Sequence, residues 1–140
     1  MSERYFVETN ILPYAHDTST GLKDQRALQL VEQLWTTGEG VLSTQVLQEL
    51  CVILRRKVAR PLPGVEIRHL IQDYLSWQIV TDSPESVVQA LEIEEHHKIS
   101  FRDALIVHAA ETAGAGILYS EDLADGQKFG GVQVVNPLRA

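Results

Sequence analysis

Cysteine is scarce in this sequence, because Cys51 is the only one among 140 residues. A single cysteine forms no disulfide within the chain and builds no thiolate metal centre by itself. Long apolar runs are also missing, since a membrane-spanning helix needs about 18 consecutive apolar residues and no such run occurs. The N-terminal segment MSERYFVETN carries no secretion signal. We therefore expect a cytoplasmic protein that does not associate with a membrane.

Positive charge is scarce as well. The 12 Lys and Arg residues are outnumbered by 19 Asp and Glu residues, which gives a formal net charge of −7. Such a surface lacks the positive field that draws proteins to nucleic acid, so a nucleic-acid substrate would need the help of cations. Hydrophobic residues make up 44% and charged residues 22% of the chain, as is usual for folded proteins. At this length we expect one domain that covers residues 1–140.

Short apolar runs alternate with helical patterns along the chain. Five β-prone runs are expected to form buried strands, at residues 5–7, 41–42, 79–80, 117–119 and 132–135. Between them, apolar residues recur at helical spacing, with Gly38 and Gly114 at predicted helix ends. Ser83 and Ser100 are typical helix caps. This alternation predicts a three-layer α/β/α domain, in which helices cover both faces of a mostly parallel five-stranded sheet.

Acidic residues stand where strands end or helices begin. Glu8 directly follows the first apolar run, and Asp122 lies just behind the fourth. Glu49 and Asp103 lie in the first two turns of two predicted helices. In an α/β sheet these positions meet at the edge formed by the carboxyl ends of the strands. We therefore predict that the four carboxylates share one site.

The chemistry of such a site follows from its charge. Several carboxylates in close proximity cannot all stay ionised at neutral pH unless a cation lies among them. Ligands that are all oxygen atoms favour Mg²⁺ or Mn²⁺. One or two such ions can activate a water molecule and stabilise the leaving oxygen of a phosphodiester. The pattern therefore indicates a metal-dependent hydrolase that cleaves phosphodiester bonds.

Each acidic residue also has a purely structural interpretation. Asp103 lies three residues after Ser100, the spacing of a capping box, in which its carboxylate would only satisfy a donor at the helix start. Glu49 would then be a solvated helix residue, while Glu8 and Asp122 would end strands in solvated turns. Their common placement favours the metal site over these separate explanations.

Four segments that span nearly the whole chain carry a family resemblance. They are FVETNILPYAHD at 6–17, LSTQVLQEL at 42–50, ISFRDALIVHAA at 99–110 and LYSEDLADGQKFGGVQVVNPL at 118–138. In order, spacing and flanking residues they resemble the PIN-domain family, and within it the VapC-like toxins. The resemblance implies a PIN-like fold, a homodimer in many members, and cleavage of RNA at a divalent metal. It also implies a cognate antitoxin as partner, since such toxins belong to type II toxin–antitoxin pairs.

The resemblance assigns roles to individual residues. The catalytic and metal-binding acids would be the four named above, held by the polar neighbours Thr9, Asn10 and Ser120. This chain departs from the family at Glu8, where aspartate is usual. The longer side chain must displace the metal or fold back to reach it. We therefore expect an attenuated enzyme.

The sequence also allows three further hypotheses. The basic residues Arg55, Arg56 and Lys57 either contact RNA phosphates or form a solvated helix end. The chain as a whole could be a PIN-like module that binds RNA or protein without cleaving, and Glu8 is the one feature that favours this alternative. A receiver-like signalling domain fits poorly, because it requires a lysine after the last strand that this sequence lacks.

Overall fold

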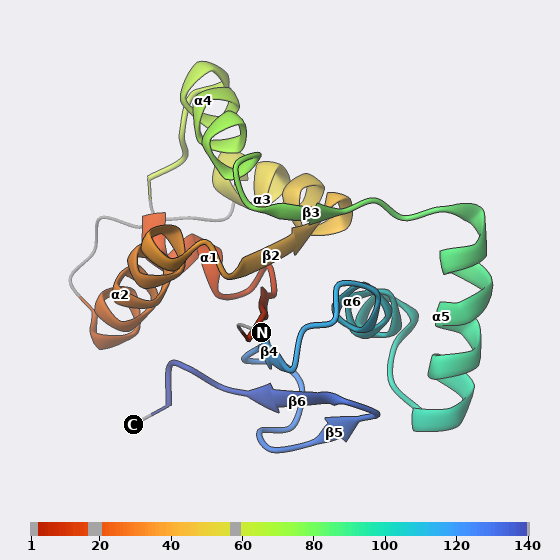
Figure 1. The fold of residues 1–140 in the computed structure, drawn as a ribbon. Coiled ribbons are helices and arrows are strands. Elements are labelled where there is room, and N and C mark those ends of the chain that lie inside the picture. The colour runs from red at the N-terminus through yellow and green to blue at the C-terminus, as the bar shows by residue number, and fades with distance from the viewer. Residues whose placement is uncertain (1–2, 17–20, 57–59, 140) are drawn as a thin grey trace.

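The structure is a computed structural model that describes residues 3–16, 21–56 and 60–139. These residues form an α/β fold with helices on both sides of a central sheet, as predicted (Figure 1). In chain order the elements are β1 (Tyr5–Val7), α1 (Leu12–His16), α2 (Leu22–Thr37), β2 (Gly40–Ser43), α3 (Thr44–Arg56), α4 (Gly64–Tyr74), β3 (Gln78–Val80), α5 (Pro84–His97), α6 (Phe101–Thr112), β4 (Ile117–Tyr119), β5 (Lys128–Phe129) and β6 (Val132–Val135).

The strands form one sheet in the order β3-β2-β1-β4-β6-β5. All neighbouring pairs are parallel except β5 with β6. In the register of β1 and β4, Val7 is the partner of Tyr119, so the two central strands end level with each other. This order differs from the 2-1-3-4-5 order of receiver domains, which argues against the signalling alternative. It also brings the residues after β1 and β4 to the same edge.

The prediction of five strands is wrong by one. The predicted strands correspond to β1, β2, β3, β4 and β6, whereas β5 is an additional edge strand. It has only two residues, Lys128 and Phe129, and a turn at Gly130 and Gly131 joins it to β6. A strand this short has no alternating pattern to detect, and the two glycines favour a turn. Helix α1 was not predicted either, because its 5 residues are too few for a helical spacing to recur.

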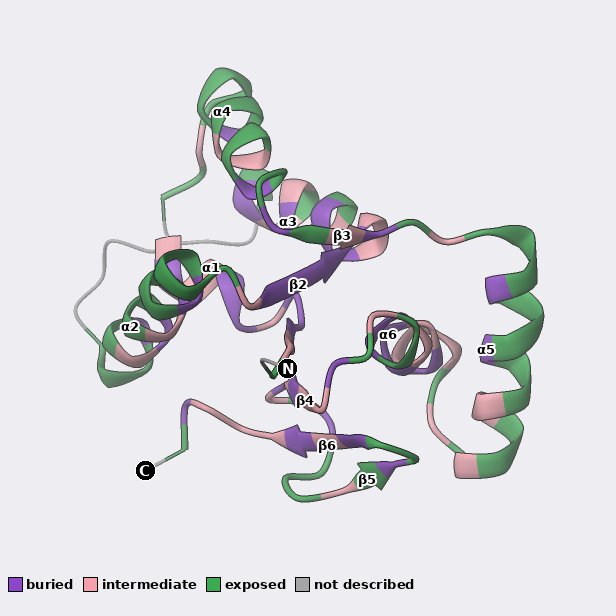
Figure 2. Cartoon of the chain, in the orientation of Figure 1, coloured by how far each residue is buried: buried purple, intermediate pink, exposed green. Residues whose placement is uncertain are grey.

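The core lies between the sheet and the helices that cover it. Phe6, Leu118 and Val134 lie side by side on three neighbouring strands and are completely buried. Helices α1 and α2 lie on one side of the sheet, and α6 lies on the other with α5 packed against its outer face (Figure 1). Figure 2 shows that buried residues follow the strands and α6, while α5 is mostly exposed. None of the helices described here is long and apolar enough to span a membrane.

Gly40, the first residue of β2, lies under a cluster of aromatic rings. A Cβ atom added at Gly40 would lie 2.5 Å from ring atoms of Trp77. Trp77 is held in place by edge-on contacts with Trp35 and Tyr74, whose ring centroids lie 5.3 and 5.2 Å away. The indole therefore cannot yield without moving its neighbours.

We expect Gly40→Ala to lower the free energy of unfolding by about 1 to 3 kcal/mol, the usual cost of overpacking a core. Urea unfolding followed by circular dichroism measures the loss. Gly64→Ala is the matched control, because a Cβ at the start of α4 meets nothing within 4 Å. Equal losses in the two variants would contradict the assigned contact with Trp77.

Candidate active site

Glu8 is the first residue after β1, and its side chain is completely buried (0% exposed). Its backbone N–H donates to the carbonyl of Tyr119 at 3.0 Å, which continues the pairing of β1 with β4. The carboxylate Oε2 accepts hydrogen bonds from Asn10 Nδ2 at 3.1 Å and from the Ser120 hydroxyl. Burial raises the pKa of Glu8, and the hydrogen bonds from Ser120 and Arg102 offset only part of this effect. The carboxylate is thus buried but fully engaged by donors.

Glu49 approaches the same place from α3. The buried side chains of Val46 and Leu50 anchor this helix in the core, and Glu49 lies at its boundary with solvent. Glu49 Oε1 accepts from the Thr9 hydroxyl at 2.7 Å and from Arg102 Nη2 at 2.7 Å. Glu49 Oε2 accepts from Arg102 Nε at 2.9 Å. Both oxygens of this carboxylate therefore have donors, two of which belong to one guanidinium group.

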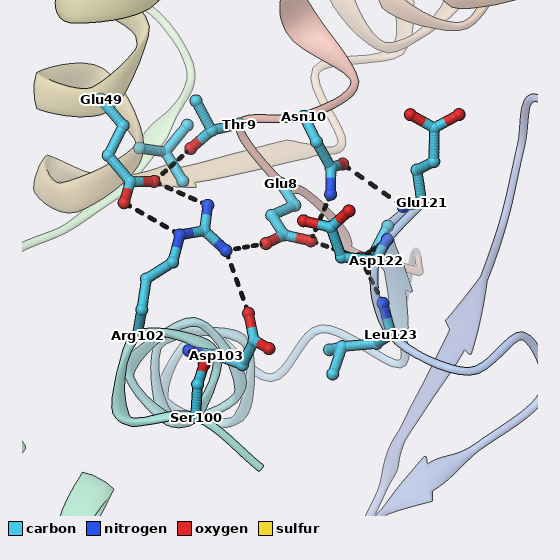
Figure 3. A network of polar contacts seen from close by, with 12 residues as sticks. Glu8, Thr9, Asn10, Glu49, Ser100, Arg102, Asp103, Glu121, Asp122 and Leu123 are labelled. Atoms are coloured by element: carbon cyan, nitrogen blue, oxygen red, sulfur yellow. Dashed lines mark hydrogen bonds and ion pairs between the residues drawn. The ribbon is translucent and has the colours of Figure 1, made fainter.

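Asp103 lies in the first turn of α6, where Ser100 forms the N-cap. The Ser100 hydroxyl accepts from the backbone N–H of Asp103 at 3.0 Å. The Asp103 carboxylate accepts instead from Arg102 Nη1 at 3.0 Å. The backbone of Asp103 thus takes part in the cap, while its side chain faces the acidic residues of the neighbouring elements (Figure 3).

The guanidinium group of Arg102 lies at the centre of these three carboxylates (Figure 3). It donates to Glu8, Glu49 and Asp103, which come from the end of β1, from α3 and from α6. Burial by itself lowers the pKa of Arg102, but hydrogen bonds and charges of Glu49 and Glu8 outweigh it and raise the pKa above its usual value. Arg102 is therefore a permanent cation here. This residue was not predicted from the sequence, where its only signal is its place beside Asp103 at the start of a predicted helix.

Asp122 lies across the groove from Glu49. Its side chain is exposed, and its backbone N–H donates to the Ser120 hydroxyl at 3.1 Å. The groove has a volume of about 350 Å³, and its lining residues are Thr9, Asn10, Glu49, Val52, Ile53, Arg102 and Asp122. The structure thus brings three of the predicted acids into contact with one cation and places the fourth on the wall of the same groove.

Two other acidic residues after β4 have different partners. Glu121 accepts from the Tyr14 hydroxyl at 3.0 Å and pairs with Lys23 at 2.5 Å. Asp125 accepts from the backbone N–H of Asn136 at 2.9 Å, within the turn toward the C-terminus. These contacts hold α1, α2 and the C-terminal segment in place. They leave Asp122 as the acid of this segment that lines the groove.

Two of the predicted RNA-binding residues lie outside the groove. Arg55 and Arg56 are exposed in the last turn of α3 and are not part of the groove lining. Lys57 lies outside the described residues. The polar residues Thr9, Asn10 and Ser120 each donate to one of the carboxylates, as described above.

The donor set of the site can be compared with what a metal ion requires. As they stand, no three His, Cys, Asp or Glu side chains within the described ranges are arranged to hold an ion. Three carboxylates instead surround one guanidinium, which offers a single positive charge to three negative ones. Hard divalent cations prefer such all-oxygen ligands. The donor chemistry therefore fits a divalent metal, provided that the carboxylates close in where the guanidinium now lies.

Comparisons with known proteins agree on one fold. The family model of the PIN domain matches residues 5–124. No curated protein matches the chain. Among solved structures, a toxin–antitoxin complex from Klebsiella pneumoniae is 17% identical with a TM-score of 0.70, and the match covers 95% of this chain and 97% of that one. The sarcin-ricin loop cleaving toxin VapC20 of Mycobacterium tuberculosis is 19% identical with a TM-score of 0.63, at 84% and 89% coverage. DNA-bound VapBC from Salmonella typhimurium is 11% identical with a TM-score of 0.65, at 95% and 97% coverage.

Proposed function

We propose that this chain, which belongs to the PIN-domain family, is a divalent-metal-dependent endoribonuclease and the toxin of a type II toxin–antitoxin pair. The observation that carries the proposal is the convergence of Glu8, Glu49 and Asp103 on one cation at the carboxyl edge of the sheet. The similarity of its fold to toxin–antitoxin complexes and to a sarcin-ricin loop cleaving toxin supports the biological role. We place the protein in the cytoplasm, with RNA as its substrate.

The proposed ligands are Glu8, Glu49, Asp103 and Asp122. A bound Mg²⁺ or Mn²⁺ would supply Lewis acidity and a water molecule of lowered pKa. The chain itself orients the carboxylate ligands. Hydrogen bonds from Ser120 and Asn10 hold Glu8, and one from Thr9 holds Glu49, so that these carboxylates keep their directions during the reaction. Val52 and Ile53 form an apolar wall of the groove.

The partner of this site follows from its charge. A groove lined by carboxylates attracts a basic side chain, and we propose that a cognate antitoxin inserts one there. Toxin–antitoxin assemblies among the structures of the same fold support this partner. We further propose that the chain forms a homodimer, which sedimentation of the purified protein tests directly.

Cleavage of a mixed RNA pool by the purified chain is the decisive experiment. We expect cleavage with Mg²⁺ or Mn²⁺ and none with EDTA. A second candidate function is a PIN-like module that binds without cleaving, which the occupation of the carboxylates by Arg102 favours. RNA that is bound but stays intact at millimolar Mg²⁺ and Mn²⁺ would support this module and contradict the nuclease.

Metal binding should also stabilise the fold. A ligand that binds only the folded state adds RT ln(1 + [L]/Kd), about 2.7 kcal/mol when the ligand is at a hundred times its Kd. We therefore expect millimolar Mn²⁺ to raise Tm by several degrees, measured by differential scanning calorimetry, and EDTA to reverse the rise. An unchanged Tm for the parent chain would count against the metal site.

A further inference from the structure

We propose that Arg102 is a resident counter-cation, which holds Glu8, Glu49 and Asp103 together in the metal-free protein and which a divalent metal must displace. The inference rests on the proposed metal site, and it adds a residue that controls when that site is available.

The guanidinium and a metal ion need the same lone pairs. Arg102 occupies both oxygens of Glu49, through Nη2 at 2.7 Å and Nε at 2.9 Å. Its Nη1 atom donates to Glu8 Oε1 and to Asp103 Oδ1, the latter at 3.0 Å. Four of the five N–H groups of the guanidinium are thus used on three carboxylates. A metal ion that binds these oxygen atoms cannot do so while the guanidinium remains in place.

The charges of the cluster favour exchange for a divalent ion. One guanidinium leaves two negative charges of the three carboxylates uncompensated, while a divalent ion leaves one. Like charges held close together oppose their own ionisation, so the cation of higher charge relieves more repulsion. Arg102 therefore stabilises the three carboxylates, although a divalent ion would compensate more of their charge.

The structure also indicates that the guanidinium group of Arg102 moves first, before the buried carboxylate of Glu8. Glu8 is completely buried and has donors in Asn10 and Ser120 besides Arg102. The side chain of Arg102 is 35% exposed and borders the open groove. Its long stem can turn into solvent while the cap at Ser100 keeps the start of α6 in place. Displacement thus begins with the rotation of one partly exposed side chain, after which the carboxylates can close in on the ion.

The first test measures metal affinity without RNA. Isothermal titration with Mn²⁺ compares the parent chain with Arg102→Gln, and we expect Kd to fall at least about fivefold in the variant. Arg68→Gln is the charge-matched control, because Arg68 is exposed on α4, and we expect its Kd to change less than about twofold. Arg102→Lys keeps the charge but loses the planar fork, so its Kd should lie between that of the parent and that of Arg102→Gln.

In EDTA, Arg102→Gln should melt at a lower temperature than the parent.

The second test observes displacement directly. In protein with ¹⁵N-labelled arginine, the Nε–H signal that is missing from Arg102→Gln belongs to Arg102. We expect this signal to exchange slowly with water in EDTA and rapidly at saturating Mg²⁺. A signal that stays protected while Mg²⁺ binds would overturn the proposal, as would an unchanged or weaker affinity in Arg102→Gln.

The two proposals can fail separately. Equal metal affinity in parent and Arg102→Gln, together with RNA cleavage by the parent, overturns the role of Arg102 and leaves the nuclease standing. If no metal binds to either protein, no ion displaces Arg102, and both proposals are wrong. If Arg102→Gln binds metal more tightly than the parent but neither protein cleaves RNA, the role of Arg102 as counter-cation is supported and the nuclease is contradicted.

Discussion

Asp103→Asn is expected to lower metal-dependent RNA cleavage by at least about a hundredfold, the size of loss that follows removal of one electrostatic contact in an active site. The substitution removes one of the three negative charges around Arg102. It also replaces a charged oxygen ligand by a neutral amide, which holds a hard cation less strongly. The helix start should survive, because the cap uses the backbone N–H of Asp103 and the hydroxyl of Ser100.

The measurement compares initial rates on mixed RNA at saturating Mg²⁺ and Mn²⁺. Circular dichroism and Tm in EDTA establish that the variant is folded. Asp73→Asn removes the same charge from an exposed position of α4 and should leave the rate unchanged. Cleavage by Asp103→Asn at the rate of the parent would mean that Asp103 serves only the start of the helix.

The sequence predicted the elements that have a periodic pattern. Strands such as β4 and β6 are apolar runs bounded by glycine or polar residues, and helices such as α5 begin at a clear cap, here Ser83. The elements β5 and α1 are too short for a periodic pattern and were not predicted. The edge of the sheet was predictable too, because a parallel sheet places the residues after its strands together. Glu8 and Ser120 meet there through the register of Val7 with Tyr119.

The partners of the acidic residues were not predictable in the same way. Arg102 contacts Glu8 across 94 positions of sequence, and Lys23 contacts Glu121 across 98. Such contacts depend on how α2, α3 and α6 pack, which no local pattern encodes. A search for clustered charges of one sign also overlooks the cation that balances them. The distinction between Glu121 and Asp122 likewise depends on distant residues, since Tyr14 and Lys23 hold the former.

Glu8→Asp is expected to speed RNA cleavage by about tenfold or more, which corresponds to at least about 1.4 kcal/mol in the barrier. Catalytic groups must lie within about 0.5 Å of their productive positions. The extra methylene of glutamate adds one C–C bond, roughly 1.5 Å, to the side chain. In this structure Glu8 uses that length to contact Arg102 while Ser120 and Asn10 hold its other oxygen. Aspartate draws the carboxylate back toward β1, which weakens the contact with Arg102 and restores the residue that the family resemblance predicts at this position.

The matched control is Glu49→Asp, which removes the same methylene from the other carboxylate of this length. There the two-pronged contact with Arg102 and the bond from Thr9 already fit glutamate, so cleavage should slow. Rates are measured at saturating Mg²⁺ and Mn²⁺, with metal affinity and Tm in parallel, because a buried methylene also contributes to stability. A faster rate of cleavage in Glu8→Asp and a slower rate in Glu49→Asp would show that the extra methylene of Glu8 is what slows the reaction. An unchanged or slower rate in Glu8→Asp would show that the site is adapted to glutamate, so that glutamate at this position does not slow the proposed nuclease.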